Sequence, residues 1–310
     1  MTPPLCILFT ICATFFHNLE VSLKHTNKNR REPSKILSFG EIIFDQINGE
    51  YFLGGAPLNF AWYTSQISTE TTLISAVGND DRGRQAISKL KKTNIRTCIR
   101  VNDIETGTAV VHDESGDFDI ISPAAWESIN PPDFECTNID LLYIGTLSQT
   151  TSNNRKELKK LLCYPIKYVF VDLNLRHPFY SKHIIENSLL TADILKVNVH
   201  EWNEIKKFEI ASTPIELMDR FNISFFAITK GCDGATLHTK TRILRYTPSK
   251  VTLVDATGSG DAFSAILAAG IIKDTDLTST LKLACDTGAF VATKKGAQTI
   301  LTNNILSQFL

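Results

Sequence analysis

The sequence lacks the features that mark several large classes of protein. Its 310 residues carry 32 Lys and Arg against 33 Asp and Glu, so there is no excess charge of one sign to bind nucleic acid or to form an acidic tail. The seven cysteines lie far apart and form no C-x-x-C pair, which excludes the usual zinc and redox motifs and is typical of reduced thiols in the cytoplasm. No apolar run reaches the roughly 20 residues that span a bilayer. With 43% hydrophobic residues, we expect a folded cytoplasmic protein that binds small molecules rather than nucleic acid or a membrane.

The first feature present is an apolar segment near the N-terminus, residues 5–16 (LCILFTICATFF), followed by the basic stretch 25–31 (HTNKNRR). Its length suits the core of a signal peptide, but no Lys or Arg precedes it and no small-x-small cleavage site follows it. A dispensable extension, a misplaced start codon, a signal or anchor, and a genuine part of the fold all stay open. We expect residues 1–34 to lie outside the fold and residues 35–310 to form one domain.

From residue 35 onward, short apolar runs alternate with amphipathic stretches of helical length. Continuously apolar runs are typical of parallel strands that helices cover on both faces. The predicted strands are 35–44, 71–77, 141–145, 167–174, 194–198, 225–230 and 251–254. The predicted helices are 58–67, 80–92, 153–163, 182–190, 200–208, 213–221, 261–272 and 277–293. This alternation predicts an α/β fold of three layers, α/β/α, around a central, mostly parallel sheet.

One segment breaks the alternation. Residues 107–122 (GTAVVHDESGDFDIIS) contain two β-rich runs around the turn 114–117, with no helix between them. A hairpin inside an α/β chain suits a small β flap beside the main sheet. We expect this flap, or lid, to comprise 46–53 and 107–122.

The strongest chemical signal is 254–263 (VDATGSGDAF), which separates a predicted strand from a helix rich in small residues. The start of a helix leaves N–H groups unpaired and attracts phosphate, and Gly258, Ser259 and Gly260 would let an anion approach that backbone. Asp261 would then face the anion as a general base for an attacking hydroxyl group. The structural alternative is that Asp261 only caps the helix and the glycines only turn the chain.

Two standard nucleotide motifs are absent. A dinucleotide fingerprint needs a third glycine where Phe263 stands. A P-loop needs G-K-[ST], but Gly83 is followed by Arg84 and Gln85. The sequence therefore supports neither a Rossmann dehydrogenase nor a Walker ATPase.

Several motifs, in order along residues 36–300, resemble those of the PfkB (ribokinase-like) carbohydrate kinases. Segment 254–263 resembles the family signature D-T-x-G-A-G-D-x-F, and 54–59 (GGAPLN) resembles its G-G-x-x-x-N element. The further matches are 40–45 (GEIIFD), 77–83 (VGNDDRG), 171–176 (VDLNLR), 198–201 (NVHE) and 229–234 (TKGCDG). This collinear set implies a ribokinase-like fold and a phosphotransferase that uses ATP and Mg²⁺. In this resemblance Asp261 is the catalytic base, and Gly258, Ser259 and Gly260 form the anion hole.

The resemblance also implies a sugar site. Its residues would be Asp45, Gly54, Gly55, Asn59, Asn174 and Arg176. The bare backbone at Gly54 and Gly55 lets a sugar approach, and the Asn59 amide can bond its hydroxyls. Asp45 is expected to end the first strand. Asp172, Asn174 and Arg176 would alternate along one strand end, with an ion pair between Asp172 and Arg176 as the structural alternative.

The nucleotide and metal sites are implied in the same way. Asn198, Thr229, Gly231 and Gly234 would bind ATP. Glu201 would reach Mg²⁺ through water, and the alternative is a first-turn Glu that the helix dipole favours. Asp255 and the Thr257 carbonyl could hold a monovalent cation such as K⁺.

Within the family, the short interval between Asp45 and Gly54 and the run 172–180 resemble fructokinases, so the implied acceptor is the primary hydroxyl of free fructose. Another ketose, a sugar acid or a nucleoside stays open as acceptor, as does a non-catalytic family member that binds sugar. A homodimer is compatible with the sequence.

Overall fold

The computed structural model describes residues 33–67, 69–112, 118–131 and 137–309. All the elements below lie in one compact unit, Ser34–Leu310. The turn predicted at 114–117 and the predicted extension up to residue 32 lie outside the described residues.

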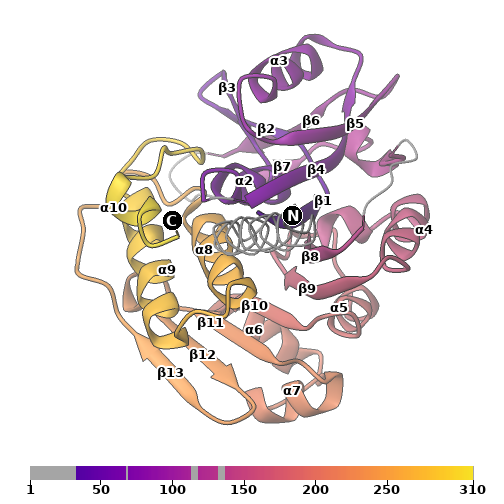
Figure 1. Ribbon diagram of the computed structural model, residues 1–310. Helices are drawn as coiled ribbons and strands as arrows, with labels where there is room; N and C mark the ends of the chain where they lie inside the picture. The colour runs from indigo at the N-terminus through magenta and orange to yellow at the C-terminus, as the bar shows by residue number, and fades with distance from the viewer. Residues whose placement is uncertain (1–32, 68, 113–117, 132–136, 310) are drawn as a thin grey trace, which may run out of the picture. The chain divides into compact units, whose positions relative to one another are not determined.

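A nine-stranded sheet forms the centre of this unit, in the order β13-β12-β11-β10-β9-β8-β1-β4-β5 (Figure 1). All neighbouring pairs from β11 to β5 are parallel, whereas β11, β12 and β13 pair antiparallel at one edge. Its strands are β1 Ser34–Phe39, β4 Thr69–Gly78, β5 Arg96–Asn102, β8 Ile139–Ile144, β9 Ile166–Asp172, β10 Ile194–Asn198, β11 Phe225–Thr229, β12 Ala235–Thr239 and β13 Ile243–Tyr246. The large, mostly parallel sheet is the predicted one.

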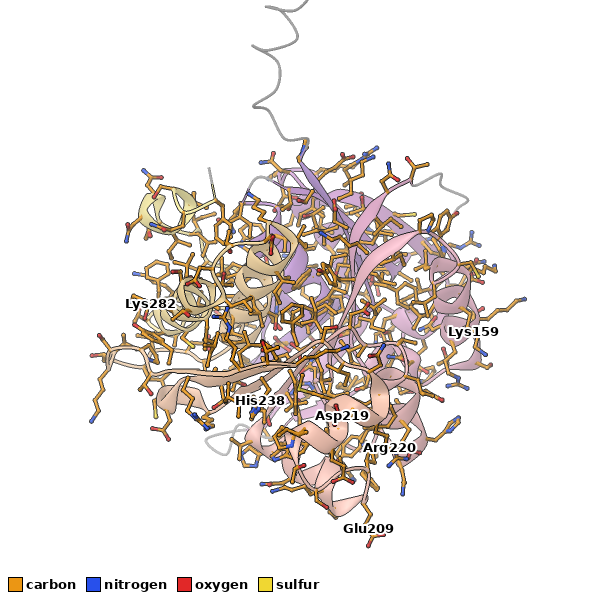
Figure 2. All side chains as sticks on the ribbon, turned by 60° about the horizontal axis from the view of Figure 1, so that its bottom comes forward. Lys159, Glu209, Asp219, Arg220, His238 and Lys282 are labelled. Carbon is orange, nitrogen blue, oxygen red and sulfur yellow. The ribbon has the colours of Figure 1, made fainter. Side chains whose placement is uncertain are left out.

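Helices cover both faces of this sheet. One core cluster joins β1, β8 and β9 to the helices α2, α8 and α9, and another joins the opposite face to α4, α5, α6 and α7. The helices are α2 Ala56–Thr64, α3 Asp81–Leu90, α4 Ser152–Leu161, α5 Lys182–Leu189, α6 Val199–Lys207, α7 Pro214–Phe221, α8 Ser259–Ile272, α9 Leu277–Val291 and α10 Asn303–Leu306. All eight predicted helices are present, and Figure 2 shows charged side chains such as Lys159 and Arg220 on the outside of the α4 to α7 layer.

The helix boundaries follow local sequence signals. Thr151, Ser181 and Thr213 each accept a hydrogen bond from a backbone amide at the start of α4, α5 and α7. Helix α8 has apolar residues on nearly every side because it packs between α2 and α9 as well as against the sheet. This burial fixes the position of its N-terminus, where Asp261 lies.

A second sheet of four strands has the order β3-β2-β6-β7. Its strands are β2 Ile43–Ile47, β3 Glu50–Gly54, β6 Gly107–Val111 and β7 Phe118–Ile120. It unites the two segments predicted as a flap, and we call it the lid sheet. None of the helices within the described ranges is long and apolar enough to cross a membrane.

Two strand predictions are corrected by the structure, and four strands were missed. The run 35–44 is two strands in different sheets, since the chain leaves β1 at Gly40 (φ 151°) and enters β2 only at Ile43. The run 251–254 is not a strand, and Val254 is 60% exposed. Strands β3, β5, β12 and β13 were not predicted, because polar residues interrupt their apolar pattern; in β12 these are the buried Thr236 and His238. Of the four cysteines within the described ranges, Cys98 and Cys285 are buried, while Cys163 and Cys232 are exposed.

Candidate active site

Most of the predicted site residues come together where the parallel strands end. Strands β1, β9 and β10 end near the N-termini of α2, α6 and α8, and the lid sheet follows directly from β1. Ligands of open α/β sheets bind beyond the carboxyl ends of such strands. The fold therefore brings residues that lie far apart in the sequence to one edge of the sheet.

Asp261 lies in the first turn of α8. Its Oδ2 atom accepts a hydrogen bond of 2.9 Å from the side-chain amide of Asn59 on α2. Burial and the neighbouring Asp172 carboxylate raise the pKa of Asp261 to about 6, against the opposing effects of Asn59, Lys196 and Arg176. A carboxyl group with this pKa is ionised at neutral pH and is still a better proton acceptor than an ordinary aspartate.

The loop before α8 has the geometry of an anion site. Gly258 adopts φ 79°, and a Cβ atom there would lie 2.4 Å from the Ala297 carbonyl oxygen, so glycine is required. The Ser259 N–H group donates to the Ala256 carbonyl oxygen at 3.2 Å. The following amides of the first turn, beginning at Gly260, are those that a helix start leaves without intrahelical partners. They offer donors to an anion beside Asp261.

A buried ammonium group beneath this loop was not predicted. Lys196 on β10 pairs with Asp172 at the end of β9, Nζ to Oδ1 3.0 Å, and the two side chains are only 8% and 1% exposed. Its Nζ atom would lie 3.3 Å from a Cβ atom at Gly260. Although burial alone lowers the pKa of Lys196, the carboxylates of Asp172, Glu201 and Asp261 hold the pKa above its usual value. The signal in the sequence was a lysine inside an otherwise apolar parallel strand (ILKVN).

The candidate sugar side centres on Asp45 and Arg176. Asp45 lies in the middle of β2 in the lid sheet, so the expectation that it ends the first strand is wrong. Burial raises the pKa of Asp45 to about 6, while Arg176 lowers it and Asp255 raises it further. Gly54 on β3 lies diagonally across from Asp45, and a Cβ atom there would be 3.0 Å from Asp45 Oδ2. A side chain at Gly54 would therefore crowd this carboxyl group.

Glu41 is a second carboxyl group at this place that the sequence analysis did not select. It follows β1 directly, is 2% exposed, and its Oε2 atom has no hydrogen-bond partner among the described residues. Burial raises the pKa of Glu41 to about 7. The positive charge of Arg176 opposes this rise, and the negative charge of Asp261 adds to it. Gly55 adopts φ 109°, and its Cβ would lie 2.5 Å from the Glu41 carbonyl oxygen. The two predicted glycines thus fit closely between lid and core.

The segment after β9 differs from its prediction. Strand β9 ends at Asp172, so Asn174 and Arg176 do not alternate along it, and Asn174 adopts φ 42°. Asp172 pairs with Lys196. Arg176 acts electrostatically on Glu41, Asp45 and Asp261, and therefore lies among the carboxyl groups of the site.

Asn198 and Glu201 form a capping box at the start of α6. Glu201 Oε2 accepts from the Asn198 N–H group (2.7 Å), and Asn198 Oδ1 accepts from the Glu201 N–H group (2.9 Å). The second Glu201 oxygen, Oε1, accepts from the Leu175 N–H group at 3.1 Å. The structural alternative for Glu201 is therefore present. Each carboxylate oxygen has a second lone pair, so these residues still fit a metal held through water.

The other predicted nucleotide residues lie one strand farther along the sheet. Thr229 ends β11 and donates through its hydroxyl to the Val197 carbonyl oxygen (3.3 Å). Gly231 adopts φ 59° with open space around its Cβ position, whereas Gly234 (φ 80°) would place a Cβ atom 2.0 Å from the Tyr246 carbonyl oxygen. Gly231 leaves room for a ligand, and Gly234 is required by the turn into β12.

Asp255 ties the anion loop to the C-terminal loop. Its Oδ1 atom accepts from the Thr257 N–H (2.9 Å) and hydroxyl (2.6 Å) groups, and its Oδ2 atom accepts from the Gly296 N–H group (2.9 Å). Despite burial, which raises the pKa of Asp255, these bonds and Lys295 hold the pKa below its usual value. A monovalent cation would have to share this carboxylate with them. In the described part of the chain, no group of three or more His, Cys, Asp or Glu side chains is arranged to hold a metal ion directly.

A cavity of about 230 Å³ separates the lid sheet from these loops. The lid side contributes Asp45 and Phe52, and the core side contributes Asp255 and Thr257. Lys295 crosses the space, with its Nζ atom 5.5 Å from the centre of the Phe52 ring. The site therefore opens between lid and core, with carboxylates on both sides.

Gln298 is a further residue that only the structure shows. Its side-chain amide donates to the Leu53 carbonyl oxygen (3.2 Å) and to Asn59 Oδ1 (3.4 Å). It thereby orients the amide that bonds Asp261 and connects it to the lid. No motif marked this position.

Comparison with known proteins agrees with the resemblance found in the sequence motifs. The model of the pfkB family carbohydrate kinases matches residues 21–304. A fructokinase of Klebsiella pneumoniae is 28% identical over 86% of this chain and 96% of its own length, and a nucleoside kinase of Methanocaldococcus jannaschii is 26% identical over 81% and 82%. The crystal structure of Vibrio cholerae fructokinase with fructose, ADP and calcium covers 90% of this chain and 100% of its own with a TM-score of 0.76 at 22% identity. This last likeness shows the ribokinase-like fold.

Proposed function

Because the chain belongs to the pfkB family of carbohydrate kinases, we propose that it transfers the γ-phosphoryl group of ATP to a primary hydroxyl group of free fructose. The observation that carries this proposal is Asp261 at the start of α8, held by Asn59 and bordered by the anion loop. Fructokinases recur among the relatives, which supports fructose as acceptor. The use of ATP favours the cytoplasm as the compartment.

Each residue of the site has its own role in the proposed reaction. Asp261 takes the proton of the attacking hydroxyl group, and the anion loop of residues 258–260, whose free amides begin at Gly260, stabilises the charge on the transferred group. Asp45 accepts hydrogen bonds from sugar hydroxyls, and Arg176 offsets the negative charge that gathers there. Closure of the lid sheet would exclude water and protect ATP from hydrolysis.

We assign the nucleotide to Asn198, Thr229, Gly231 and Gly234, next to the anion loop. Mg²⁺ would neutralise charge on the phosphates, with Glu201 reached through water. Asp255 and the Thr257 carbonyl would hold the proposed monovalent cation. Asn59, proposed as a sugar ligand, also has a positioning role because its amide nitrogen donates to Asp261.

ADP release with a panel of acceptors tests the proposed substrate. We expect fructose to give a kcat/KM at least about tenfold above ribose, a sugar acid, adenosine and fructose 6-phosphate, since each good polar contact is worth about a factor of ten. A higher kcat/KM for another acceptor would identify that acceptor, rather than fructose, as the substrate. The proposed phosphoryl transfer would still hold. If a folded, ATP-binding protein released no ADP with any acceptor, the non-catalytic alternative would hold.

The pH dependence of turnover provides a second test. Since the base must be ionised and the pKa of Asp261 is raised to about 6, kcat/KM should fall as pH drops below 6, approaching tenfold per pH unit. Asp45 has a pKa of about 6 as well, so the profile is also measured in Asp45→Asn. We expect the acid limb to remain in that variant. A midpoint near pH 4 in both proteins would contradict the assignment.

A further inference from the structure

The lid sheet has two faces, and only one of them borders the proposed sugar site. Side chains alternate between faces along a strand, so Asp45 and Gln46 on β2 point to opposite sides. Asp45 pairs with Phe52 on β3, and both line the cavity toward the core. Gln46 pairs with Tyr51, and Thr108 on β6 shares their face. This back face of the lid is unexplained by the proposed reaction.

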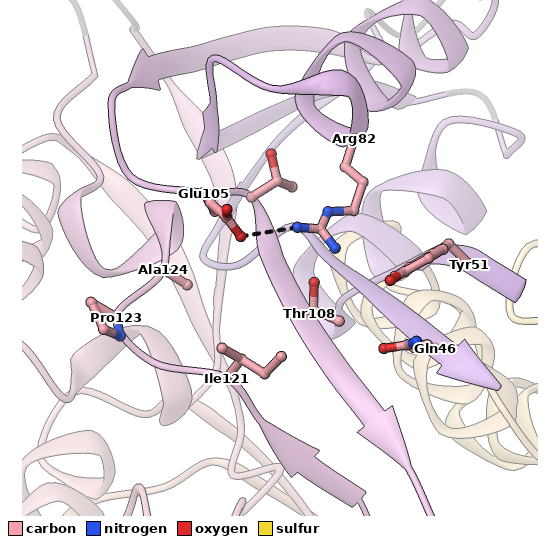
Figure 3. A pocket seen from close by; sticks show the side chains of 9 residues that line it. Gln46, Tyr51, Arg82, Glu105, Thr108, Ile121, Pro123 and Ala124 are labelled. Atoms are coloured by element: carbon pink, nitrogen blue, oxygen red, sulfur yellow. Dashed lines mark hydrogen bonds and ion pairs between the residues drawn. The ribbon is translucent and has the colours of Figure 1, made fainter. Parts of the chain in front are cut away.

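A second cavity, of about 110 Å³, lies behind the lid. Its lining includes Gln46, Tyr51, Arg82, Glu105, Thr108 and Ile121. Figure 3 shows the Arg82 guanidinium, the Tyr51 hydroxyl, the Gln46 amide and the Thr108 hydroxyl turned toward one space, with Ile121 and Pro123 beside it. This volume exceeds what one water needs several times over and suits an oxyanion group of about five heavy atoms.

The Thr108 hydroxyl group is the observation that points to a ligand. Thr108 is 3% exposed and its Oγ1 atom has no hydrogen-bond partner among the described residues. Its neighbour Thr106 is different, because its hydroxyl donates to Asp80 (2.7 Å) and accepts from the Gly78 N–H group (2.9 Å). Buried hydroxyl groups without partners are costly and uncommon. Thr108 is therefore a donor available inside this cavity.

The charges around the cavity favour an anion. Arg82, at the start of α3, pairs with Glu105 at 3.2 Å, and its guanidinium lies 5.3 Å from the centre of the Tyr51 ring. Glu105 is 81% exposed, so this pair is weak, and a guanidinium has further N–H groups to offer. Two further acidic groups near the cavity are already bonded: Asp80 accepts from the Gly83 and Thr106 amides and from the Thr106 hydroxyl, and Glu127 accepts from the Ala124 amide and the Ser122 hydroxyl.

We propose that this cavity binds a small oxyanion, the carboxylate or phosphate group of a metabolite, through Arg82, Thr108, Gln46 and Tyr51. Arg82 supplies the charge, and the three uncharged side chains supply donors. Gln46 is adjacent to Asp45 on β2, so an anion behind the lid changes the affinity for sugar in front of it. The effect on sugar affinity rests on the proposed function, whereas the binding of the anion does not. By linkage, the sugar must change the affinity for the anion by the same factor.

Calorimetric titration of the full chain with inorganic phosphate, and separately with malonate, tests binding without any turnover. We expect millimolar binding of at least one of them, weakened at least tenfold in Arg82→Gln and about threefold or more in Thr108→Val, a substitution of similar shape. Glu105→Gln removes the competing carboxylate and should tighten binding about twofold or more. An anion bound at the loop before α8 would be common to all variants and cancels in the comparison.

Three results would overturn the proposal: no binding by the wild-type chain, equal binding by wild type, Arg82→Gln and Thr108→Val, or weaker binding in Glu105→Gln. The relative strength of phosphate and malonate decides between the two anion classes. Circular dichroism and Tm confirm that each variant is folded, and Arg82→Lys keeps the charge if Arg82→Gln does not fold.

The link to the lid is measured as the KM for sugar with and without the bound anion. We expect a change of at least about threefold in wild type, no change in Arg82→Gln, and the same anion-free turnover in both proteins. An anion that binds but leaves KM unaltered refutes the link and leaves the site in place. If the chain proves to have no kinase activity, calorimetry still decides whether the anion binds.

Discussion

Asp261→Asn is expected to lower kcat by about 10²- to 10⁴-fold, the usual contribution of a general base. The amide cannot accept the proton of the sugar hydroxyl, yet it has nearly the same shape. Asn59 would still lie at hydrogen-bonding distance, since an amide oxygen can replace Oδ2 as acceptor. Folding and ATP binding should therefore persist while turnover is lost. Steady-state ADP release, together with ATP titration of the variant, measures both properties.

The matched control is Asp274→Asn, just beyond the other end of α8. Asp274 is exposed and has φ 55°, a conformation that asparagine adopts readily, so kcat should stay within about twofold of wild type. If Asp261→Asn retains more than about a tenth of the activity, Asp261 is not the base. If Asp261→Asn loses ATP binding or unfolds, the role of Asp261 is structural.

Lys196→Met is expected to have the largest effect on stability. Removal of one partner from a buried ion pair leaves the other charge uncompensated and costs about 3–5 kcal/mol. Asp172 would still accept a hydrogen bond from the Ser264 hydroxyl group, at 3.1 Å, but would have no ammonium group beside it. Urea unfolding gives the free energy directly. The same substitution at Lys207, whose pair with Glu204 is exposed, should cost under about 1 kcal/mol.

A double variant separates the structural role of Lys196 from its electrostatic one. Lys196→Met combined with Asp172→Leu removes both charges and should recover most of the lost stability. We expect activity to stay low, because no ammonium group remains beneath Gly260 to offset charge at the anion loop. Full activity in the double variant would show that Lys196 acts only through Asp172. A loss below about 1 kcal/mol in the single variant would show that the pair is unimportant.

The helices could be predicted well because their signals are local. Amphipathic spacing and capping residues such as Thr151, Ser181 and Thr213 lie within the segments that they define. Strands were harder, since their partners are distant in sequence. The run 251–254 is apolar but pairs with no strand, whereas β12 and β13 are partly polar and complete the edge of the sheet.

The candidate base and the glycine turns could also be located from sequence. In the segment around Asp261, the glycines and the aspartate have the spacing expected at the start of a helix. Gly55 and Gly258 adopt positive φ values, as glycine turns do. Asp45 was assigned to the correct region but to the wrong sheet. The break at Gly40 depends on how the lid leaves the core, and a continuous apolar run conceals it.

By itself, the sequence determined the fold class, the pfkB family and the identity of the candidate base, because these depend on composition, periodicity and ordered motifs. Only the tertiary structure decided which charges meet. Lys196 pairs with Asp172, Arg176 lies among three carboxyl groups, and Gln298 holds Asn59. The cavity behind the lid is likewise lined by residues of α3, β2 and β6. These contacts join residues up to 239 positions apart, and electrostatic and hydrogen-bond energies depend on separations of a few ångströms that no local pattern encodes.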